Sequence, residues 1–466
     1  MATVLWFTNT WVKVVNEDQD DDDPAEYRYY YMQSSGKAYK AGDSSDVKFK
    51  TIDGKKYAFD DDGKMLYGWV KKDDANLATD DSDWEDAEYY LGSWEDGSMK
   101  TGWQKITVYD QDEDDDYDYW FNFKSNGEKR TRTDNNAKDK DIYEKKINGK
   151  YYGFDKRGVM TYEWTATTES DLSTISNWRY FNSPEDGARS TKGWFKVVAA
   201  EYLNKSKYDD DEDAWYYADG SGNIYAGEFK TIKGKKYAFR TDGRMINGLK
   251  FIQKDNNGKI TDVKADDDDP NFDTEDDFIN HAISFYLKNN YECYYFGGSE
   301  DGAMRTNKTN ITIDGDNFNF YFEKSGSNKG AGLTGEKDDK YYLAGMLVKA
   351  GSDEKYQVVK KVTLSNGKVA YQKIADAKKF LDSVAHTTPS ANSDGKVTIG
   401  GANTGAVTKK SDDLKEAYDI TTPSADYFLV NTSGSVVDKK SKSKDGDDYV
   451  FVTGSKGVII GVYVED

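Results

Sequence analysis

The chain contains one cysteine and two histidines among its 466 residues. Cys293 cannot form an internal disulfide, and no cysteines or histidines have the spacing of metal ligands, so we predict no metal and no cofactor. Cysteine poverty suits a reducing compartment, but it also suits a surface protein stabilised by the stacking of repeats. The cysteine count therefore leaves the compartment open.

Long apolar runs and basic clusters are also missing. No stretch approaches the ~20 apolar residues of a membrane-spanning helix, and the first residues lack the basic and apolar regions of a signal peptide. We expect no membrane insertion and a chain that begins inside a larger protein. The formal net charge of −21 argues against nucleic acid as a partner, because phosphates require clustered Lys and Arg.

Catalytic motifs are absent as well. The sequence holds no Gly-x-Ser-x-Gly, no His-Glu-x-x-His and no phosphate-binding Gly-Lys-Ser/Thr loop. With 85 Asp and Glu residues, a pair of nearby carboxylates does not indicate a glycosidase. His281 and His386 have no nucleophile motif around them, so we predict that the chain is not an enzyme and has no catalytic residues.

Aromatic residues and internal repeats are what the sequence has in abundance. Aromatics make up 15% of the chain, which predicts a folded protein with a thin core filled by rings. The segment 49–59 returns almost unchanged at 229–239, and a third copy lies at 147–154. Because the turn glycines of the three copies are Gly54, Gly149 and Gly234, the period is close to 90 residues, which is typical of stacked units.

Each copy has the pattern of β-hairpins. Short aromatic runs alternate with turn pairs such as Asp53-Gly54 and Asn148-Gly149, which favour type I′ turns. Gly-Trp pairs begin further strands. We predict an all-β fold, an elongated β-solenoid of stacked hairpins in about four super-repeats over 1–350.

An acidic run occurs in every super-repeat. These runs are Glu17–Asp23, Asp110–Asp118, Asp209–Asp213 and Asp266–Asp269. Their variable length favours solvated loops on one side of the array. Calcium binding is the alternative, but the regular spacing of a calcium loop is missing, so we predict that a chelator leaves the stability unchanged.

The composition changes after about Gly351. Apolar residues at helical spacing predict one amphipathic helix over 371–385, and the stretch 386–424 has the composition of a loop or spacer. Hairpins resume near the end. We therefore divide the chain into a hairpin array (1–350), a spacer with one helix (351–425) and terminal hairpins (426–466).

The repeat spellings resemble a known family. Gly-Lys-Lys-Tyr-Ala-Phe-x3-Gly-x-Met-x2-Gly-Trp at 54–69 and Ala-Trp-Tyr-Tyr-Ala-Asp-Gly-Ser-Gly at 214–222 are similar to the cell-wall-binding (choline-binding and glucan-binding) repeats of Gram-positive bacterial surface proteins. The resemblance covers roughly 1–350 and 426–466. It implies a secreted protein at the cell surface or in the cell wall, with ligand sites between consecutive hairpins.

Carried over to this sequence, the resemblance implies aromatic ligand sites. The candidate carbohydrate-binding residues are Trp69, Trp103, Trp194, Tyr57, Tyr90, Tyr152, Trp215, Tyr217 and Tyr237. Flat rings can bind the C–H face of a sugar or a quaternary ammonium group, and a row of weak sites gains strength by multivalency. The same rings can instead fill the core of a thin solenoid. At Gly248-Leu249 the Trp of the pair is replaced.

Three functions remain open at this stage. The first is non-catalytic glycan binding, which would attach a secreted protein to a cell-wall polymer or an α-glucan such as starch. The second is an adhesin or structural spacer whose C-terminal part (351–466) binds a protein partner. The third is the non-catalytic region of a larger secreted hydrolase or toxin.

Overall fold

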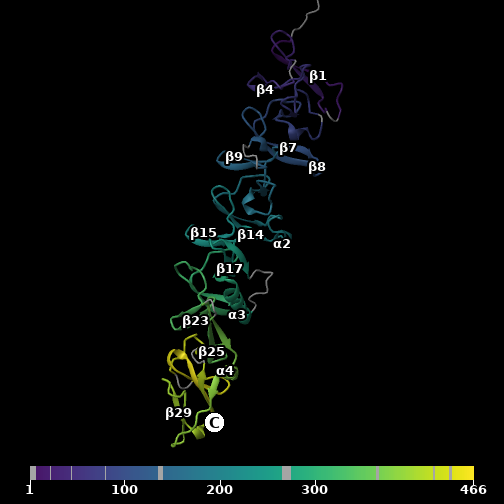
Figure 1. The fold of residues 1–466 in the computed structure, drawn as a ribbon. Coiled ribbons are helices and arrows are strands. Elements are labelled where there is room, and N and C mark those ends of the chain that lie inside the picture. Colours follow the sequence, from purple (N-terminus) through teal and green to yellow (C-terminus); the bar gives the residue numbers. More distant parts are fainter. Residues whose placement is uncertain are drawn as a thin grey trace, which may run out of the picture. The chain divides into compact units, whose positions relative to one another are not determined.

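The computed structural model describes residues 7–20, 23–42, 45–78, 80–134, 140–264, 274–363, 367–422, 426–439 and 443–466. The chain divides into two compact units, Met1–Tyr225 (unit 1) and Ala226–Asp466 (unit 2). The regular structure of the described residues is mainly short strands in small antiparallel sheets, with a few short helices (Figure 1). This confirms the prediction of a mostly β chain built from hairpins.

Unit 1 is a series of two-stranded antiparallel sheets, each made of consecutive strands. The pairs are β1 (Thr10–Val15) with β2 (Tyr27–Met32), β3 (Lys50–Ile52) with β4 (Lys55–Tyr57), β5 (Trp69–Val70) with β6 (Tyr89–Tyr90), β7 (Gly102–Asp110) with β8 (Asp115–Phe123), β9 (Tyr143–Ile147) with β10 (Lys150–Phe154), β11 (Trp164–Ala166) with β12 (Trp178–Tyr180), and β13 (Gly193–Val198) with β14 (Asp213–Ala218). Short helices α1 (Asp83–Asp86) and α2 (Lys205–Asp209) and the 3-10 turns η1 (Arg132–Asp134) and η2 (Ile175–Asn177) lie between strands.

The hairpin turns have the geometry that their sequences predict. Asp53 and Gly54 have φ of 48° and 82°, and Asn148 and Gly149 have φ of 48° and 90°. Two consecutive positive φ angles are the requirement of a type I′ turn, whose twist matches that of the flanking strands. Each Gly-Trp pair coincides with the start of a strand, at β5, β7 and β13.

A ladder of side chains and turn glycines links consecutive repeats. After most of the aromatic strands the chain turns back through an isolated bridge, such as Phe154 with Met160, and a residue at this turn-back lies beside a glycine of a later repeat. A Cβ added to Gly187 would lie 2.3 Å from Cε of Met160. The pairs of this ladder in unit 1 are Met65 with Gly97, Met99 with Gly127, Lys129 with Gly158, Met160 with Gly187, and Arg189 with Gly222.

The core of unit 1 consists of small separate clusters. One contains Ile52, Phe59 and Met65 with Trp11 packed against it, and another contains Trp84 and Phe121 with Trp69 packed against it. Their members come from consecutive hairpins, so each hairpin contributes one face to a cluster on either side. This is the thin, ring-filled core that the composition predicts.

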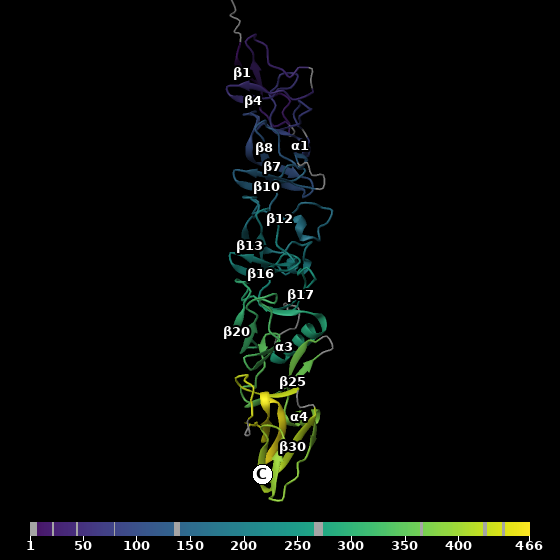
Figure 2. The same cartoon turned by 60° about the vertical axis from the view of Figure 1, so that its left-hand side comes forward.

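Unit 2 begins with the repeat hairpin β15 (Glu228–Ile232) and β16 (Lys235–Phe239) and continues in larger sheets (Figure 2). The sheet orders are β18-β17-β19, β20-β21-β24-β23-β22, β26-β25-β31 and β27-β30-β34-β33-β32, with a separate hairpin β28-β29. The bounds are β17 (Leu249–Lys254), β18 (Ile260–Lys264), β19 (Glu292–Tyr295), β20 (Asn307–Ile313), β21 (Asp316–Phe322), β22 (Gly335–Lys337), β23 (Lys340–Leu343), β24 (Met346–Leu347), β25 (Tyr356–Thr363), β26 (Val369–Ile374), β27 (Ala385–Thr387), β28 (Lys396–Ile399), β29 (Val407–Lys410), β30 (Leu414–Thr422), β31 (Tyr427–Asn431), β32 (Ser443–Lys444), β33 (Tyr449–Thr453) and β34 (Ile459–Glu465).

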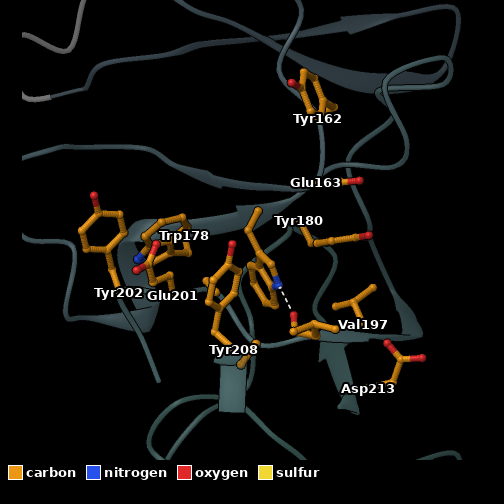
Figure 3. Close-up of a pocket in the computed structure, with 13 residues that line it drawn as sticks. Tyr162, Glu163, Trp178, Tyr180, Val197, Glu201, Tyr202, Tyr208 and Asp213 are labelled. Atoms are coloured by element: carbon orange, nitrogen blue, oxygen red, sulfur yellow. Dashed lines mark hydrogen bonds between the residues drawn. The ribbon is translucent and has the colours of Figure 1, made fainter. Parts of the chain in front are cut away.

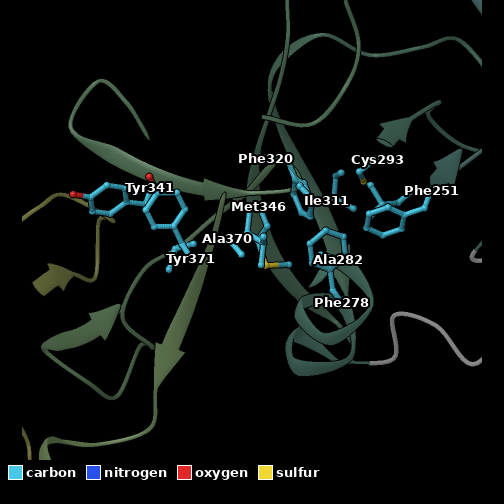
Figure 4. Close-up of a cluster of buried hydrophobic side chains, with 14 of the residues drawn as sticks. Phe251, Phe278, Ala282, Cys293, Ile311, Phe320, Tyr341, Met346, Ala370 and Tyr371 are labelled. Atoms are coloured by element: carbon cyan, nitrogen blue, oxygen red, sulfur yellow. The ribbon is translucent and has the colours of Figure 1, made fainter. Parts of the chain in front are cut away.

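The helices of unit 2 are α3 (Glu275–Ala282), which continues as a π-helical turn η3 (Ile283–Lys288), and α4 (Ala377–Ser383), with 3-10 turns η4 (Ser411–Asp413) and η6 (Ser455–Gly457). Figure 4 shows Phe251, Phe278, Phe320 and Tyr371 in the main core of this unit. Helix α3 packs its buried Phe278 into this core, against residues of strands that precede and follow the helix in the sequence.

Two sequence predictions for the C-terminal part need correction. The helix expected over 371–385 exists but is confined to α4, because residues 369–374 form β26 and pair with β25. The loop expected over 386–424 is wrong for the described residues, since β27–β30 occupy much of it and pair with β34 and with each other. Strand β25 also pairs with β31, so residues on both sides of position 425 share one sheet.

Candidate functional site

An open pocket of about 510 Å³ lies between the hairpins β11-β12 and β13-β14 of unit 1 (Figure 3). Its lining is aromatic and acidic. The residues are Tyr162, Glu163, Trp164, Trp178, Tyr180, Val197, Val198, Ala199, Ala200, Glu201, Tyr202, Tyr208 and Asp213. Cavities of this size with a few convergent polar groups are the usual sites of small ligands.

The inner wall is held by the two hairpins. Trp164 at the start of β11 pairs with Tyr180 of β12, and their ring centres are 5.3 Å apart. The indole Nε1 of Trp164 donates to the carbonyl oxygen of Val198 at 2.8 Å, the dashed line in Figure 3. The Trp164 ring also contacts the buried Tyr216 edge to face at 5.0 Å. Strand pairing, this hydrogen bond and ring packing therefore fix the position of the Trp164 ring.

The outer wall comes from the connection between β13 and β14, residues 199–212. It carries Tyr202, which is 64% exposed, and Tyr208, which is 46% exposed. Helix α2 within this connection begins at Asn204, whose side chain accepts a hydrogen bond from the amide of Lys207 at 3.2 Å. Lys205 then forms ion pairs with Glu201 and Asp209, both at 3.1 Å. These contacts hold the connection in place and leave the rings of Tyr202 and Tyr208 exposed.

Three carboxylates lie at the pocket, one of which, Glu201, is paired with Lys205. Glu163, Glu201 and Asp213 are all exposed at its rim. Burial raises the pKa of Tyr180, and the neighbouring charges of Glu163 and Asp213 raise it further. Tyr180 therefore keeps its hydroxyl proton at neutral pH. The pocket offers hydroxyl donors, carboxylate acceptors and flat ring faces within one cavity.

The preceding super-repeat has the same strand pairs, but other groups of the chain pack against its rings. There Trp69 pairs with Tyr90, and both pack against a cluster that contains the buried Trp84 of helix α1. The guanidinium of Arg157 lies 5.2 Å from the centre of the Trp84 ring. The connection between β7 and β8 is short, residues 111–114, where the later copy has residues 199–212.

A buried lysine completes this closed copy. The ammonium of Lys129 donates to the carbonyl oxygens of Trp84 at 2.6 Å and Glu85 at 3.0 Å. It also lies 5.1 Å from the centre of the Trp69 ring. Burial lowers the pKa of Lys129 to about 7, although the carboxylates of Asp155 and Glu88 act in the opposite direction. The chain's own basic groups thus lie against the Trp69 and Trp84 rings of this copy.

The predicted site residues fall into separate groups. The ring centre of Trp103 lies 4.8 Å from that of Tyr152 and 5.7 Å from that of Phe154, with the Phe154 ring tilted relative to it. The same contacts recur between Trp11 and Tyr57 at 4.9 Å and between Trp11 and Phe59 at 5.8 Å. These pairs join consecutive hairpins, as the resemblance implied, but their rings pack on one another.

The other predicted residues lie elsewhere in the array. Trp194 contacts Trp215 at 6.4 Å and its strand partner Tyr217 at 5.1 Å, and these three rings are half-buried. Tyr237 in β16 of unit 2 is buried. Trp69 and Tyr90 belong to the closed copy described above. None of the nine predicted residues lines the open pocket.

The sequence reasoning missed the pocket because it treated the acidic runs as solvated loops. The run 209–213 ends at a pocket residue, Asp213, and the tyrosines just before it form the outer wall. A signal was present in the length of the connection, which is longer here than in the preceding copy and contains Tyr202 and Tyr208.

The described residues of the acidic runs are exposed, as predicted, except for one buried carboxylate at the end of each of two runs. Asp110 is 1% exposed. It accepts hydrogen bonds from Tyr119 at 2.7 Å and Arg157 at 2.8 Å. Asp23 is 8% exposed and accepts a hydrogen bond from the hydroxyl of Tyr67 at 2.6 Å. Residues 21–22 and the run 266–269 lie outside the described residues.

Within the ranges that the structure describes, no three His, Cys, Asp or Glu side chains are grouped to hold a metal ion. In the same ranges, no helix has both the length and the apolar character needed to cross a membrane.

Comparison with known proteins gave matches among solved structures. Choline-binding protein F of Streptococcus pneumoniae, crystallised in the presence of a peptidoglycan analogue, is 20% identical over 70% of this chain and 94% of its own, with a TM-score of 0.36. The neighbours include pneumococcal choline-binding proteins. CbpJ of the same organism is 18% identical over 77% of this chain and 99% of its own, with a TM-score of 0.35. The modular autolysin LytC, also pneumococcal, is 19% identical over 78% of this chain and 57% of its own, with a TM-score of 0.33.

No family model matches the chain, and no curated protein matches it. The solved neighbours are of the class that the repeat spellings resemble. At these identities and TM-scores the likeness brings no ligand to this chain. A function has to be proposed from its own residues.

Proposed function

We propose that this chain is a non-catalytic glycan-binding protein that attaches to a cell-wall polymer or an α-glucan, and that the pocket beside Trp164 is a principal site. The observation that carries the proposal is the pocket itself. It combines flat aromatic walls with exposed hydroxyl and carboxylate groups. Aromatic faces contact the C–H face of a sugar at little entropic cost, while polar side chains exchange hydrogen bonds with its hydroxyls.

The repeated ring pairs support a polymer as ligand. Half-buried aromatics recur in two consecutive super-repeats, at Trp103 in one and at Trp194 and Trp215 in the next. If the hairpins stack as a solenoid over 1–350, each set would add a weak contact to the same polymer, and the contacts would add up through effective concentration. The proposed location is the cell surface or cell wall, and the domain bounds at 350 and 425 stay predictions.

A second candidate ligand is a cationic substituent of the polymer, such as choline. The observation that favours it is the three carboxylates, Glu163, Glu201 and Asp213, around an aromatic pocket. Cations are attracted by ring faces and by carboxylates. In the closed copy, the Nζ of Lys129 lies over the ring of Trp69, so a basic group already occupies the corresponding hairpin junction once in this chain.

Retention on immobilised material tests the proposal. The chain is passed over isolated Gram-positive cell wall, starch and dextran, alongside Tyr208→Ala and the control Tyr117→Ala. Tyr117 is 39% exposed and does not line the pocket. We expect retention on at least one material, reduced by Tyr208→Ala and unchanged by Tyr117→Ala. No retention on any material, or equal retention of all three proteins, would overturn the proposal.

The two ligand candidates are separated by competition and charge. Choline chloride added to the buffer should elute the protein only if an ammonium group is bound. Replacing Asp213 by Asn removes the charge and keeps the shape, so it should weaken binding of a cation strongly and binding of a neutral sugar little. Elution by free sugar and not by choline would support the glycan.

A protein partner for residues 351–466, as in an adhesin, stays a prediction. The pairing of β25 with β31 across position 425 does not bear on whether such a partner exists.

A further inference from the structure

The most exposed large aromatic residue among those lining the pocket is Tyr202, with 64% of its surface exposed. Its ring is nearly parallel to that of Trp178, with centres 6.4 Å apart and an angle of 25° between the planes. Trp178 is buried, and its Nε1 donates to the carbonyl oxygen of Leu172 at 2.9 Å. Tyr202 therefore extends a fixed aromatic wall outward and keeps one face free of the protein's own rings.

The rings of the pocket form two groups. The inner group is Trp164 and Tyr180, held by strand pairing, and the outer group is Trp178 and Tyr202. In Figure 3, Tyr202 and Asp213 lie at opposite ends of the labelled residues. A cavity of about 510 Å³ falls in the range that takes ligands of several rings.

We propose that Tyr202, supported by Trp178, forms an outer subsite for a second sugar ring, so that the pocket binds a segment of at least two linked sugars. This rests on the proposed glycan-binding function and goes beyond it by naming the length of the ligand and the residue that reads it. The inner rings hold one sugar. The exposed face of Tyr202 stacks on the next, and Glu201 beside it accepts hydrogen bonds from hydroxyls.

The subsite belongs to one super-repeat. The loop that carries Tyr202 is pinned by the ion pairs of Lys205 with Glu201 and Asp209 and by the cap of α2. The matching connection in the preceding copy, residues 111–114, reads Gln-Asp-Glu-Asp and has no aromatic residue. The two copies therefore have similar strand pairs, and the longer connection of the later copy adds the subsite.

Calorimetric titration with oligosaccharides of one to four units tests the subsite. The probes are glucose to maltotetraose and the matching series of N-acetylglucosamine oligomers. For the series that binds, we expect the disaccharide to bind about tenfold more tightly than the monosaccharide, which corresponds to about 1.4 kcal/mol. A ring-on-ring contact provides up to about this amount.

Three variants sharpen the result. Tyr202→Ala should reduce the gain from the second unit to less than about twofold and leave binding of the monosaccharide unchanged, because the inner rings remain. Tyr202→Phe should keep most of the gain, since the flat face survives. Tyr117→Ala is the matched control, because Tyr117 is also exposed and stacks on a neighbour, Tyr119, at 5.7 Å, but lies outside the pocket lining.

The outcomes separate this inference from the proposed function. Retention on polysaccharide with no gain from the second unit, or a gain that Tyr202→Ala leaves intact, overturns the subsite and leaves glycan binding standing. Retention without binding of either series also overturns it. Loss of all retention in the earlier experiment removes the proposed function and the subsite together.

Discussion

Replacing Lys129 by Met tests whether burial makes Lys129 lose its proton in the folded closed copy. Lys129 holds the ladder position that Met99 and Met160 hold in neighbouring repeats, so a Met side chain fits the path of its stem. Burial lowers its pKa from 10.5 to about 7. Between these two values the unfolded chain binds a proton that the folded chain does not, so stability rises with pH in this window.

The size of the effect follows from the shift. Each pH unit between about 7 and 10 adds up to about 1.4 kcal/mol to the free energy of unfolding. From pH 7 to 9.5, wild type should therefore gain about 3 kcal/mol relative to Lys129→Met, which cannot titrate. Below pH 7 the lysine is protonated in both states, and the difference between the two proteins should become constant.

The measurement is thermal unfolding of both proteins at several pH values between 6 and 9.5, with the exposed Lys145→Met as control. Comparison with the variant cancels the titration of tyrosines and carboxylates elsewhere. A difference that stays flat across this range would refute the reasoning. It would mean that the carbonyl oxygens of Trp84 and Glu85 and the ring of Trp69 hold the lysine charged in the fold.

Three further outcomes are expected. Gly187→Ala should destabilise unit 1 by about 1–3 kcal/mol, because φ is +55° and the new Cβ would meet Met160 at 2.3 Å. Gly68→Ala, where φ is +65° and nothing lies within 4 Å, should cost less in thermal unfolding, and equal losses would count against the ladder. Asp110→Asn should cost about 1–3 kcal/mol at neutral pH, because Arg157 loses its shortest ion pair and keeps only the longer ones with Asp155 at 3.4 Å and Glu85 at 3.9 Å. Although burial opposes its ionisation, hydrogen bonds from Tyr119 and Arg157 hold the pKa of Asp110 below its ordinary value, so this stabilisation should be lost as pH falls through that lowered pKa, and a variant as stable as wild type at pH 7 would contradict it. Trp103→Ala should lower the melting temperature through about 3–5 kcal/mol of lost packing, with Trp103→Phe less affected; retention on polysaccharide, compared where both variants are folded, shows whether the ring also binds ligand.

The hairpins could be predicted because their determinants are local. Asp53-Gly54 and Asn148-Gly149 specify turns by backbone angles that few residue types adopt, and the repeats present this signal several times. Helix α4 was predicted too long. Tyr371, which was counted in the helical pattern, is in β26 and stacks on Tyr341 at 4.6 Å, and the helix begins only after Asp376 caps it at 2.6 Å.

The candidate site could not be found from the repeats alone. Repeat analysis selects residues that recur, but the pocket exists because one connection, residues 199–212, does not recur. The recurring rings, such as Trp103 and Tyr152, pack against each other instead. Helix α3 was missed although local signals were present, because Thr274 caps it, acidic residues fill its first turn, and the buried Phe278 and Ala282 lie four residues apart.

The ladder also sets rules for exchanging repeats between arrays. Each glycine of this ladder fits a side chain of one earlier repeat, and two of these side chains are basic. Lys129 donates to the carbonyl oxygens of Trp84 and Glu85, and Arg189 pairs with Glu144. A graft that cuts between a bridge residue and its glycine would join mismatched partners, such as a guanidinium beneath a turn adapted to a thioether. Recombination of such arrays should therefore succeed when a bridge residue, its glycine and its charge partners move as one block.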